Sequence, residues 1–249
     1  AFMPPLHGLR VIDLTRVLAG PYCAMMLGDM GAEIIKIEEP THGDDTRAWA
    51  PFKDGVSTFF LGMNRSKKSV ALNLKSTEGA ATLRDLIRDA DILIENFRPG
   101  SLKKLGFDYN SLSETYPQLI YCSITGYGQQ GPKSDLPGYD TVIQGEAGLM
   151  HVTGARGGPP TRVGVAITDY LAGLYAMNGI LLALRARDET GLGQHVDIAD
   201  HDEGRVVGPE PTLVEVFEIF GFKGANRSLG SRTRERYPVG VLVAVEQGR

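Results

Sequence analysis

Apolar runs with the length of buried strands alternate along most of the chain with segments in which apolar residues recur at helical spacing. We predict strands at residues 9–14, 32–38, 69–74, 91–96 and 119–124, and helices at 20–31, 77–88, 139–149 and after Asp169. Strands separated by helices are typical of a parallel sheet covered by helices. The pattern therefore predicts an α/β fold with a doubly wound, mainly parallel sheet of the Rossmann-like kind.

The alternation weakens near residue 199, where the sequence becomes polar. We therefore divide the chain into a large Rossmann-like domain, residues 1–199, and a divergent tail, residues 200–249, which is a remnant of a linker or of a smaller domain. Within the tail we expect a weak helix at 212–222, a solvated basic loop at 228–236 and a last strand at 239–245.

Composition is that of an ordinary globular protein. The chain has 249 residues, of which 42% are hydrophobic and 22% charged, so it can bury a sizeable core. A formal net charge of −4 argues against nucleic acid or an anionic membrane surface as the main partner. Cys23 and Cys122 lie in apolar segments far apart in sequence, which indicates two buried free thiols rather than a disulfide or a metal site.

Targeting and membrane segments are not evident in the sequence. We expect no membrane span, because we find no apolar run of the ~20 residues that a span requires. The first residues have neither the charged nor the apolar region of a signal peptide. We therefore expect a cytoplasmic protein if the source is bacterial, and a mitochondrial matrix protein if it is eukaryotic.

The loops that follow the predicted strands are rich in Arg, Lys and Asn. Ligands of doubly wound sheets gather beyond the carboxyl ends of the strands. The loops concerned are 15–21, 38–47, 73–75, 96–100 and 125–131. Their cations favour an anionic, phosphorylated ligand.

Asp169 stands where an apolar run turns into a long helix. Asp is preferred at helix N-caps, so a capping role is the simplest interpretation. Asp can also act as a carboxylate nucleophile in covalent catalysis. The local sequence around Asp169 does not distinguish a cap from a nucleophile. Evidence from the rest of the chain is needed.

Several segments, taken together and in order, resemble the family III CoA-transferases, the group that includes formyl-CoA:oxalate CoA-transferase. The resemblance runs from about Leu6 to Ile198. The segments are Gly8–Pro21, Leu27–Glu38, Gly43–Arg47, Asn64–Ser69, Glu95–Gly100, Ser123–Gly128 and Gly138–Asp140. Residues 16–22, 120–128 and 148–154 look most like the succinyl-CoA:glutarate CoA-transferases.

The resemblance implies that Asp169 is the nucleophile. Its carboxylate would attack an acyl-CoA thioester to give a mixed anhydride and CoA thiolate. The thiolate would return to form an aspartyl-CoA thioester, which the acceptor carboxylate attacks. CoA would thus pass from a donor such as succinyl-CoA to a carboxylic or dicarboxylic acid such as glutarate, with no covalently bound cofactor and no metal.

The resemblance also implies which residues bind CoA. They are Arg16, Leu18, Ala19, Leu72, Asn73, Lys75, Asn96, Phe97, Arg98, Lys104 and Tyr139. For Lys75, Lys104, Phe97 and Asn96, each considered alone, a structural role is as plausible as CoA binding. Glu39 replaces an arginine of formyl-CoA transferase, which puts an adenine contact there in question. Arg47 either holds a dicarboxylate or closes its loop by pairing with Asp44 or Asp45.

Two other functions stay open. An acyl-CoA racemase of the same fold family would need a His/Asp acid–base pair, for which His151 is the candidate. The second open function is that of a catalytically inactive chain, which binds CoA or pairs with a full-length partner. Family members are longer, carry a second, smaller domain and form interlocked dimers, so we expect a homodimer and regard the tail as truncated or divergent.

Overall fold

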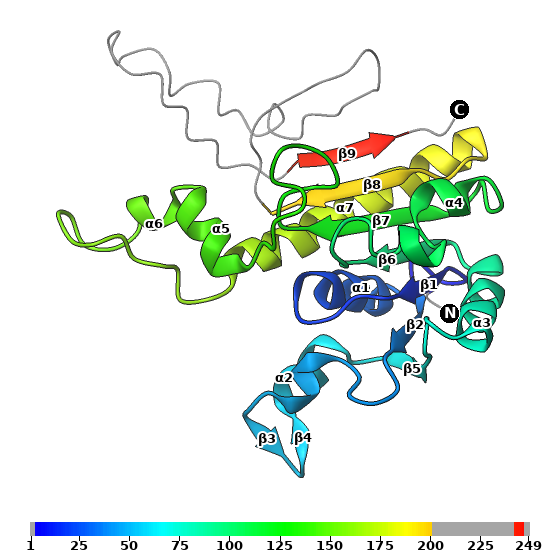
Figure 1. Ribbon diagram of the computed structural model, residues 1–249, viewed down its shortest axis with the longest axis horizontal. Helices are drawn as coiled ribbons and strands as arrows, with labels where there is room; N and C mark the ends of the chain where they lie inside the picture. The colour runs from blue at the N-terminus through cyan, green and yellow to red at the C-terminus, as the bar shows by residue number, and fades with distance from the viewer. Residues whose placement is uncertain (1–2, 201–241, 247–249) are drawn as a thin grey trace, which may run out of the picture.

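The computed structural model describes residues 3–200 and 242–246, and its centre is a seven-stranded sheet (Figure 1). The strand order is β5-β2-β1-β6-β7-β8-β9, and every pairing is parallel except that of β9 with β8. The strands are β1 Arg10–Asp13, β2 Glu33–Glu38, β5 Lys67–Ala71, β6 Ile92–Glu95, β7 Ile120–Thr125, β8 His195–Ala199 and β9 Leu242–Glu246. The predicted fold class, α/β with a doubly wound and mainly parallel sheet, is confirmed.

Helices cover both faces of the sheet. The described helices are α1 Ala19–Asp29, α2 Thr58–Met63, α3 Thr77–Arg88, α4 Tyr109–Ser113, α5 Asp140–Glu146, α6 Leu149–Val152 and α7 Ile167–Thr190. Two 3-10 turns, η1 Asp45–Ala48 and η2 Lys103–Leu105, and a small hairpin of β3 Phe52–Lys53 and β4 Val56–Ser57 complete the described elements. The hairpin with α2, and the arm of α5 and α6, both project from the central sheet (Figure 1).

Strand residues that point to opposite faces of the sheet build two separate hydrophobic cores. On one face Val11 and Ile34 pack with α1 and α7, and on the other Ile12 and Ile35 pack with α3 and α4. The parallel strands are apolar on both sides for this reason. Cys23 and Cys122 are free and buried in the first core, as predicted, and burial raises the pKa of both thiols.

Helix α7 crosses the first face and is held there by small residues. Gly173 lies so close to α1 that a Cβ atom on it would meet the Ala19 carbonyl oxygen at 2.7 Å. Contrary to our expectation, α7 has the length and composition of a membrane span, the one such helix among the described residues. Ala172, Ala176 and Ile180 are fully buried in the core, and a single apolar helix of this kind is weak support for a membrane role.

Several element boundaries differ from the prediction. The strand expected at 69–74 is β5, shifted toward the amino end, because Lys67 is not a solvated residue but reaches the buried Asp13 carboxylate at 2.8 Å. The helix expected at 139–149 is two helices, divided at Gly148, whose φ of 77° no right-handed helix allows. We assigned no element to residues 195–199, which form β8.

The tail is described at Asp200 and at β9, and β9 overlaps the strand predicted at 239–245. The helix expected at 212–222 and the basic loop at 228–236 lie outside the described residues. The remaining predicted elements agree with the structure, and the helix at Thr77–Arg88 agrees at both ends.

Candidate active site

The carboxyl ends of β1 and β6 form the centre of the candidate site. β1 continues to β2 and β5 on one side of the sheet, whereas β6 continues to β7 and β8 on the other. The loops after β1 and β6 therefore lead to opposite sides of the sheet. Doubly wound sheets bind ligands at such a switch point between two neighbouring strands. Arg16 and Asn96, one from each loop, meet there.

The Asn96 side chain joins the two loops through the backbone of Arg16. Its Oδ1 accepts a hydrogen bond from the Arg16 N–H at 3.0 Å, and its Nδ2 donates to the Arg16 carbonyl oxygen at 2.8 Å. The Arg16 guanidinium lies 3.6 Å from Asp45, and both side chains are largely exposed, so this ion pair contributes little. Arg16 can still turn toward an anionic ligand.

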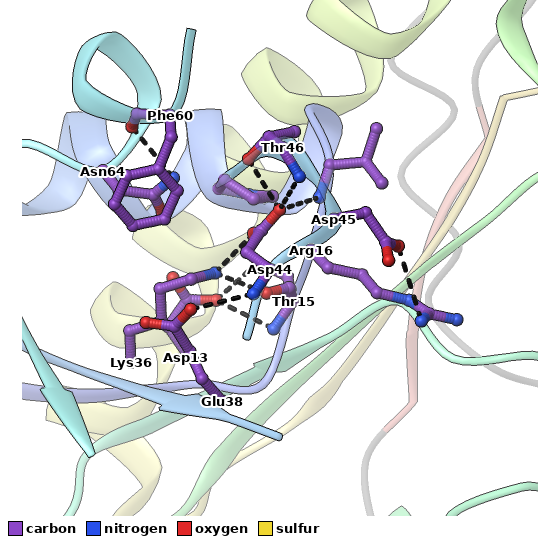
Figure 2. A network of polar contacts seen from close by, with 12 residues as sticks. Asp13, Thr15, Arg16, Lys36, Glu38, Asp44, Asp45, Thr46, Phe60 and Asn64 are labelled. Atoms are coloured by element: carbon purple, nitrogen blue, oxygen red, sulfur yellow. Dashed lines mark hydrogen bonds and ion pairs between the residues drawn. The ribbon is translucent and has the colours of Figure 1, made fainter. Parts of the chain in front are cut away.

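A buried ionic network lies directly beneath the loop after β1 (Figure 2). Lys36 on β2 donates to the Thr15 carbonyl oxygen at 2.7 Å and lies 2.9 Å from Asp44, with both charged side chains buried. Lys67 lies 2.8 Å from Asp13. Burial alone would raise the pKa of Asp13, but Lys67 and Lys36 hold it lower, at about 2. We did not predict this network, because Lys36 comes from β2 and its partners Thr15 and Asp44 come from two separate loops.

Arg47 pairs with neither Asp44 nor Asp45, which were the partners expected from the sequence. Its guanidinium makes two hydrogen bonds of 2.7 Å to the Glu38 carboxylate and lies over the Phe60 ring at 3.8 Å. Burial would raise the pKa of Glu38, but hydrogen bonds led by those from Arg47 lower it to about 2. Arg47 thus closes its loop through Glu38.

Asp169 lies in the first turn of α7, not at its N-cap. The N-cap is Ala166, and Asp169 is the third residue of the helix, so the capping interpretation is wrong. Because α7 runs antiparallel to the strands, its first turn lies at their carboxyl ends. Within the described part of the chain no hydrogen bond engages the Asp169 carboxylate.

Another carboxylate supplies the cap. Asp140 at the start of α5 accepts hydrogen bonds from the Thr168 N–H at 3.0 Å and the Thr168 hydroxyl at 2.9 Å. Gln144, which is fully buried, donates to Asp140 at 2.7 Å and accepts from the Val163 N–H at 2.8 Å. This network fixes the turn that carries Asp169. No local pattern in the sequence indicates it, because Asp140 and Thr168 are distant in the chain.

Burial and neighbouring charge raise the pKa of Asp169 to about 6. Partial burial is the larger cause, and the Asp140 carboxylate is the second. Asp200 at the end of β8 is also close enough to interact, and burial with these two carboxylates raises its own pKa well above the usual value. At neutral pH Asp169 is still mainly ionised, as a carboxylate nucleophile must be.

The other candidate CoA residues divide between the two faces of the sheet. Leu18 and Ala19 are buried where α1 begins, and Ala19 belongs to the core shared with α7. Leu72 and Phe97 pack against the core on the opposite face. A ligand touching all four would have to cross the carboxyl edge of the sheet at its centre.

The polar candidates lie around this edge in different ways. Asn73 is exposed after β5 and accepts a hydrogen bond from the Lys75 N–H at 3.1 Å. Lys75, Arg98 and Lys104 are exposed, and among the described residues none of them forms an ion pair. Tyr139 is 69% exposed at the N-cap of α5, next to Asp140. Exposed cations at the carboxyl ends of the strands suit a phosphate ligand.

Two further candidates are separate from this arrangement. Glu39 is exposed and accepts a hydrogen bond from the His42 N–H at 2.8 Å. His151 is exposed on α6, and within the described residues no hydrogen bond or ion pair joins it to Asp169. His, Cys, Asp and Glu side chains nowhere gather into a metal-binding cluster among the residues that the structure describes.

A partly buried carboxylate at the strand ends of an α/β sheet, together with exposed cations on the loops that follow β1, β5 and β6, defines the class of site. The model of CoA-transferase family III matches residues 6–240, and the chain belongs to this family. The match continues beyond Ile198, where the resemblance was expected to end.

Curated relatives agree with this assignment. The chain is 49% identical to the succinyl-CoA:glutarate CoA-transferase of Mus musculus over 78% of its own length and 45% of that protein. It is 49% identical to the succinate–glutarate CoA-transferase of Agrobacterium fabrum, over 79% of the chain and 51% of that protein. The chain thus spans about half the length of these relatives.

Solved structures agree as well. A CAIB/BAIF family protein from Brucella suis is 46% identical and superposes with a TM-score of 0.77, covering 80% of this chain and 53% of that one. The fold of the central sheet is therefore that of known members of the family.

Proposed function

We propose that this chain provides the nucleophile and much of the CoA site of a CoA-transferase. The observation that supports this most is the position of Asp169, a partly buried carboxylate without a hydrogen-bond partner among the described residues, in the first turn of α7. The relatives named as succinyl-CoA:glutarate CoA-transferases support succinyl-CoA as donor and glutarate as acceptor.

The reaction begins when an Asp169 oxygen attacks the thioester carbonyl carbon of the donor. The C–S bond breaks, which gives a mixed anhydride and CoA thiolate. The thiolate attacks the aspartyl carbonyl, the donor carboxylate leaves, and an aspartyl-CoA thioester forms. The acceptor carboxylate then attacks the aspartyl carbonyl and releases the thiolate, which takes the acceptor acyl group and regenerates Asp169.

The surrounding residues have separate tasks in this proposal. Arg16, Lys75, Arg98 and Lys104 neutralise phosphates of CoA, while Leu18, Leu72 and Phe97 pack against its apolar parts. Asn73, Asn96 and Tyr139 belong to the same edge of the sheet, and Ala19 leaves room for the pantetheine arm. Backbone N–H groups at the start of α1 are the candidate donors to a developing oxyanion, because those of Ile167, Thr168 and Tyr170 in α7 already donate within the chain.

The partners in this proposal are small molecules, an acyl-CoA and a carboxylic acid. Assembly as a homodimer, the 1–199 and 200–249 division of the chain and a mitochondrial or cytoplasmic location remain predictions. The racemase alternative gains no support, because His151 has no contact with Asp169 in the described structure.

Mass spectrometry of the intact chain tests the proposal. After incubation with succinyl-CoA, the wild type should carry a CoA adduct that hydroxylamine removes, and Asp169→Asn should carry none. Asp85→Asn, which removes an exposed carboxylate of α3, is the matched control and should react like the wild type. CoA binding without an adduct would favour the inactive CoA-binding chain, and an adduct on Asp169→Asn would exclude Asp169 as the nucleophile.

A further inference from the structure

Val17, in the loop between β1 and α1, has a backbone conformation that its side chain disfavours. Its φ is 72°, in the left-handed region, where a β-branched residue is a clear outlier. Such a conformation persists only where the surrounding structure imposes it. Val17 stands between Arg16 and Leu18, two of the residues that we assign to CoA binding.

Three side chains hold the backbone on both sides of Val17. Asn96 makes the two hydrogen bonds to the Arg16 backbone, at 3.0 and 2.8 Å. Asp44 accepts from the Val17 N–H at 3.3 Å, and Lys36 donates to the Thr15 carbonyl oxygen at 2.7 Å. We call Lys36, Asp44 and Asn96 the loop clamp.

Within the clamp, the pair of Lys36 and Asp44 is itself firmly held (Figure 2). Lys36 and Asp44 are 2.9 Å apart, and both side chains are at most 1% exposed. Asp44 also accepts hydrogen bonds from the N–H and the hydroxyl of Thr46, at 3.0 and 2.7 Å, and donates its own N–H to Glu38 at 2.9 Å. Removing one charge would leave the other buried without a partner, so the clamp keeps one geometry.

The conformation imposed on Val17 also fixes the start of α1. Leu18 is the N-cap and Ala19 the first residue of that helix. Ala19 is in turn packed against Gly173, one turn beyond Asp169 on α7. Tyr22 of α1 and Tyr170 of α7 meet edge to face, with ring centroids 5.0 Å apart. A change in the loop would therefore reach the surroundings of the nucleophile.

We propose that Lys36, Asp44 and Asn96 are positioning residues that hold Val17 in its left-handed conformation and so keep the Arg16–Ala19 loop in the shape that receives acyl-CoA. This inference rests on the proposed function for the identity of the ligand. It assigns Asn96 a role through the loop backbone, in place of the direct CoA contact that the family resemblance implies.

A rescue experiment separates the two roles of Asn96. Asn96→Ala removes the clamp's two bonds to Arg16, and we expect Val17 to leave the left-handed region and the affinity for CoA to fall about tenfold. Glycine adopts positive φ without strain. Val17→Gly combined with Asn96→Ala should therefore bring the dissociation constant for CoA to within about threefold of the wild type.

Val17→Thr is the matched control, because threonine keeps the branched Cβ and the strain. Combined with Asn96→Ala, it should leave the affinity for CoA low. Isothermal titration with CoA itself gives the dissociation constants. A failure of glycine to rescue, or an equal rescue by threonine, would overturn the proposal and favour a direct contact between Asn96 and CoA.

A second measurement needs no ligand. Hydrogen exchange should be slow at the Arg16 and Val17 amides of the free wild-type chain and at least about tenfold faster in Asn96→Ala, while β1 exchanges as before. If exchange at these amides is the same in Asn96→Ala as in the wild type, the clamp proposal is wrong, even if the chain binds CoA. Conversely, a chain that shows the exchange pattern but binds no CoA would contradict the proposed function and leave the clamp standing.

The buried pair provides an independent variant. Lys36→Met together with Asp44→Leu removes both charges and the hydrogen bonds to the Thr15 and Val17 backbone at once, so no buried charge is left alone. We expect faster exchange at Val17 and rescue of CoA affinity by Val17→Gly, as with Asn96→Ala. Circular dichroism establishes that this variant is folded before affinity is measured. If the Val17 amide of the folded variant exchanges at the wild-type rate, Lys36 and Asp44 do not belong to the clamp.

Discussion

At the scale of single residues, Asp169 combines two properties that oppose each other. Partial burial and the nearby Asp140 carboxylate disfavour its ionised form and raise its pKa to about 6. Its place in the first turn of a 24-residue helix favours the ionised form, because the helix dipole is positive there. The result is a carboxylate that is charged at neutral pH but poorly stabilised, which suits the nucleophile that we propose.

The pH dependence of the reaction should reflect this. We expect the rate of adduct formation with succinyl-CoA to rise as pH increases through about 6, the pKa of Asp169, because only the ionised carboxylate attacks. In Asp140→Asn the pKa of Asp169 should fall toward its ordinary value, and the midpoint of the profile should move to lower pH. The asparagine side chain of this variant retains an oxygen that can accept from Thr168, so the helix turn stays in place.

Measuring single-turnover rates between about pH 4.5 and about pH 8, values chosen to bracket the pKa, checks this prediction. Asp85→Asn on the exposed face of α3 is the control and should keep the wild-type midpoint. A profile of Asp140→Asn that coincides with that of the wild type would mean that Asp140 does not influence the titration of Asp169.

The same shift has a consequence for stability. The folded-state pKa of Asp169 is above its unfolded value, so its contribution to stability is fully present below about 4, the unfolded pKa, and is lost as pH rises through about 6. Asp169→Asn should therefore unfold at a higher urea concentration than the wild type at about pH 8 but not at about pH 4. Equal midpoints of the two chains at the higher pH would contradict the raised pKa.

At the scale of elements, the contact between α1 and α7 positions the first turn of both helices. It depends on Gly173, where a Cβ would lie 2.7 Å from the Ala19 carbonyl oxygen and 2.9 Å from the Tyr22 ring. A methyl group fits only if the helices separate. Helix packing is thus directly linked to the distance between the Arg16–Ala19 loop and Asp169.

Gly173→Ala should destabilise the chain by about 1–3 kcal/mol through overpacking, although alanine is the better helix former. Gly62→Ala is the matched control, since Gly62 is also helical but has nothing within 4 Å of an added Cβ. That variant should gain about 0.5–1 kcal/mol. Urea unfolding of both variants measures the difference, and equal effects of the two substitutions would contradict tight packing at Gly173.

Prediction from the sequence succeeded where one physical signal decided the element. The apolar runs of the parallel strands and the caps of α3 are such local signals. The five predicted strands and α3 were accordingly placed to within a few residues. Asp169 was proposed as the nucleophile only because the family resemblance added what its local sequence lacks, and its role stays a prediction. Asp140 and Lys36 were missed, because their partners Thr168 and Asp44 come from other elements and only the folded chain brings them together.

At the scale of the whole molecule, β9 shows that the tail contributes to the sheet. It pairs antiparallel with β8, from Leu242 opposite Ala199 to Glu246 opposite His195. Asp200 follows β8 directly and interacts with Asp169 through its charge. The boundary that we placed at residue 199 therefore separates two strands of one sheet.

A proline scan tests whether this pairing forms in solution. Successive N–H groups of a strand point to opposite sides, so of Val243 and Ala244 one directs its N–H toward β8 and the other away. β9 is the last strand in the described sheet, and an edge strand tolerates proline only where the N–H faces outward. One proline variant should lose about 1–3 kcal/mol relative to the other, and its β8 amides should exchange faster.

Each proline variant is the control for the other, because they differ in position by one residue. Paired β9 predicts a large difference between them in urea unfolding and in hydrogen exchange of residues 195–199. Two variants with the same stability as the wild type would mean that β9 does not join the sheet, and the tail would then be a separate appendage. A large difference would instead make residues 242–246 part of the domain that carries Asp169, and any active form of this chain would have to retain them.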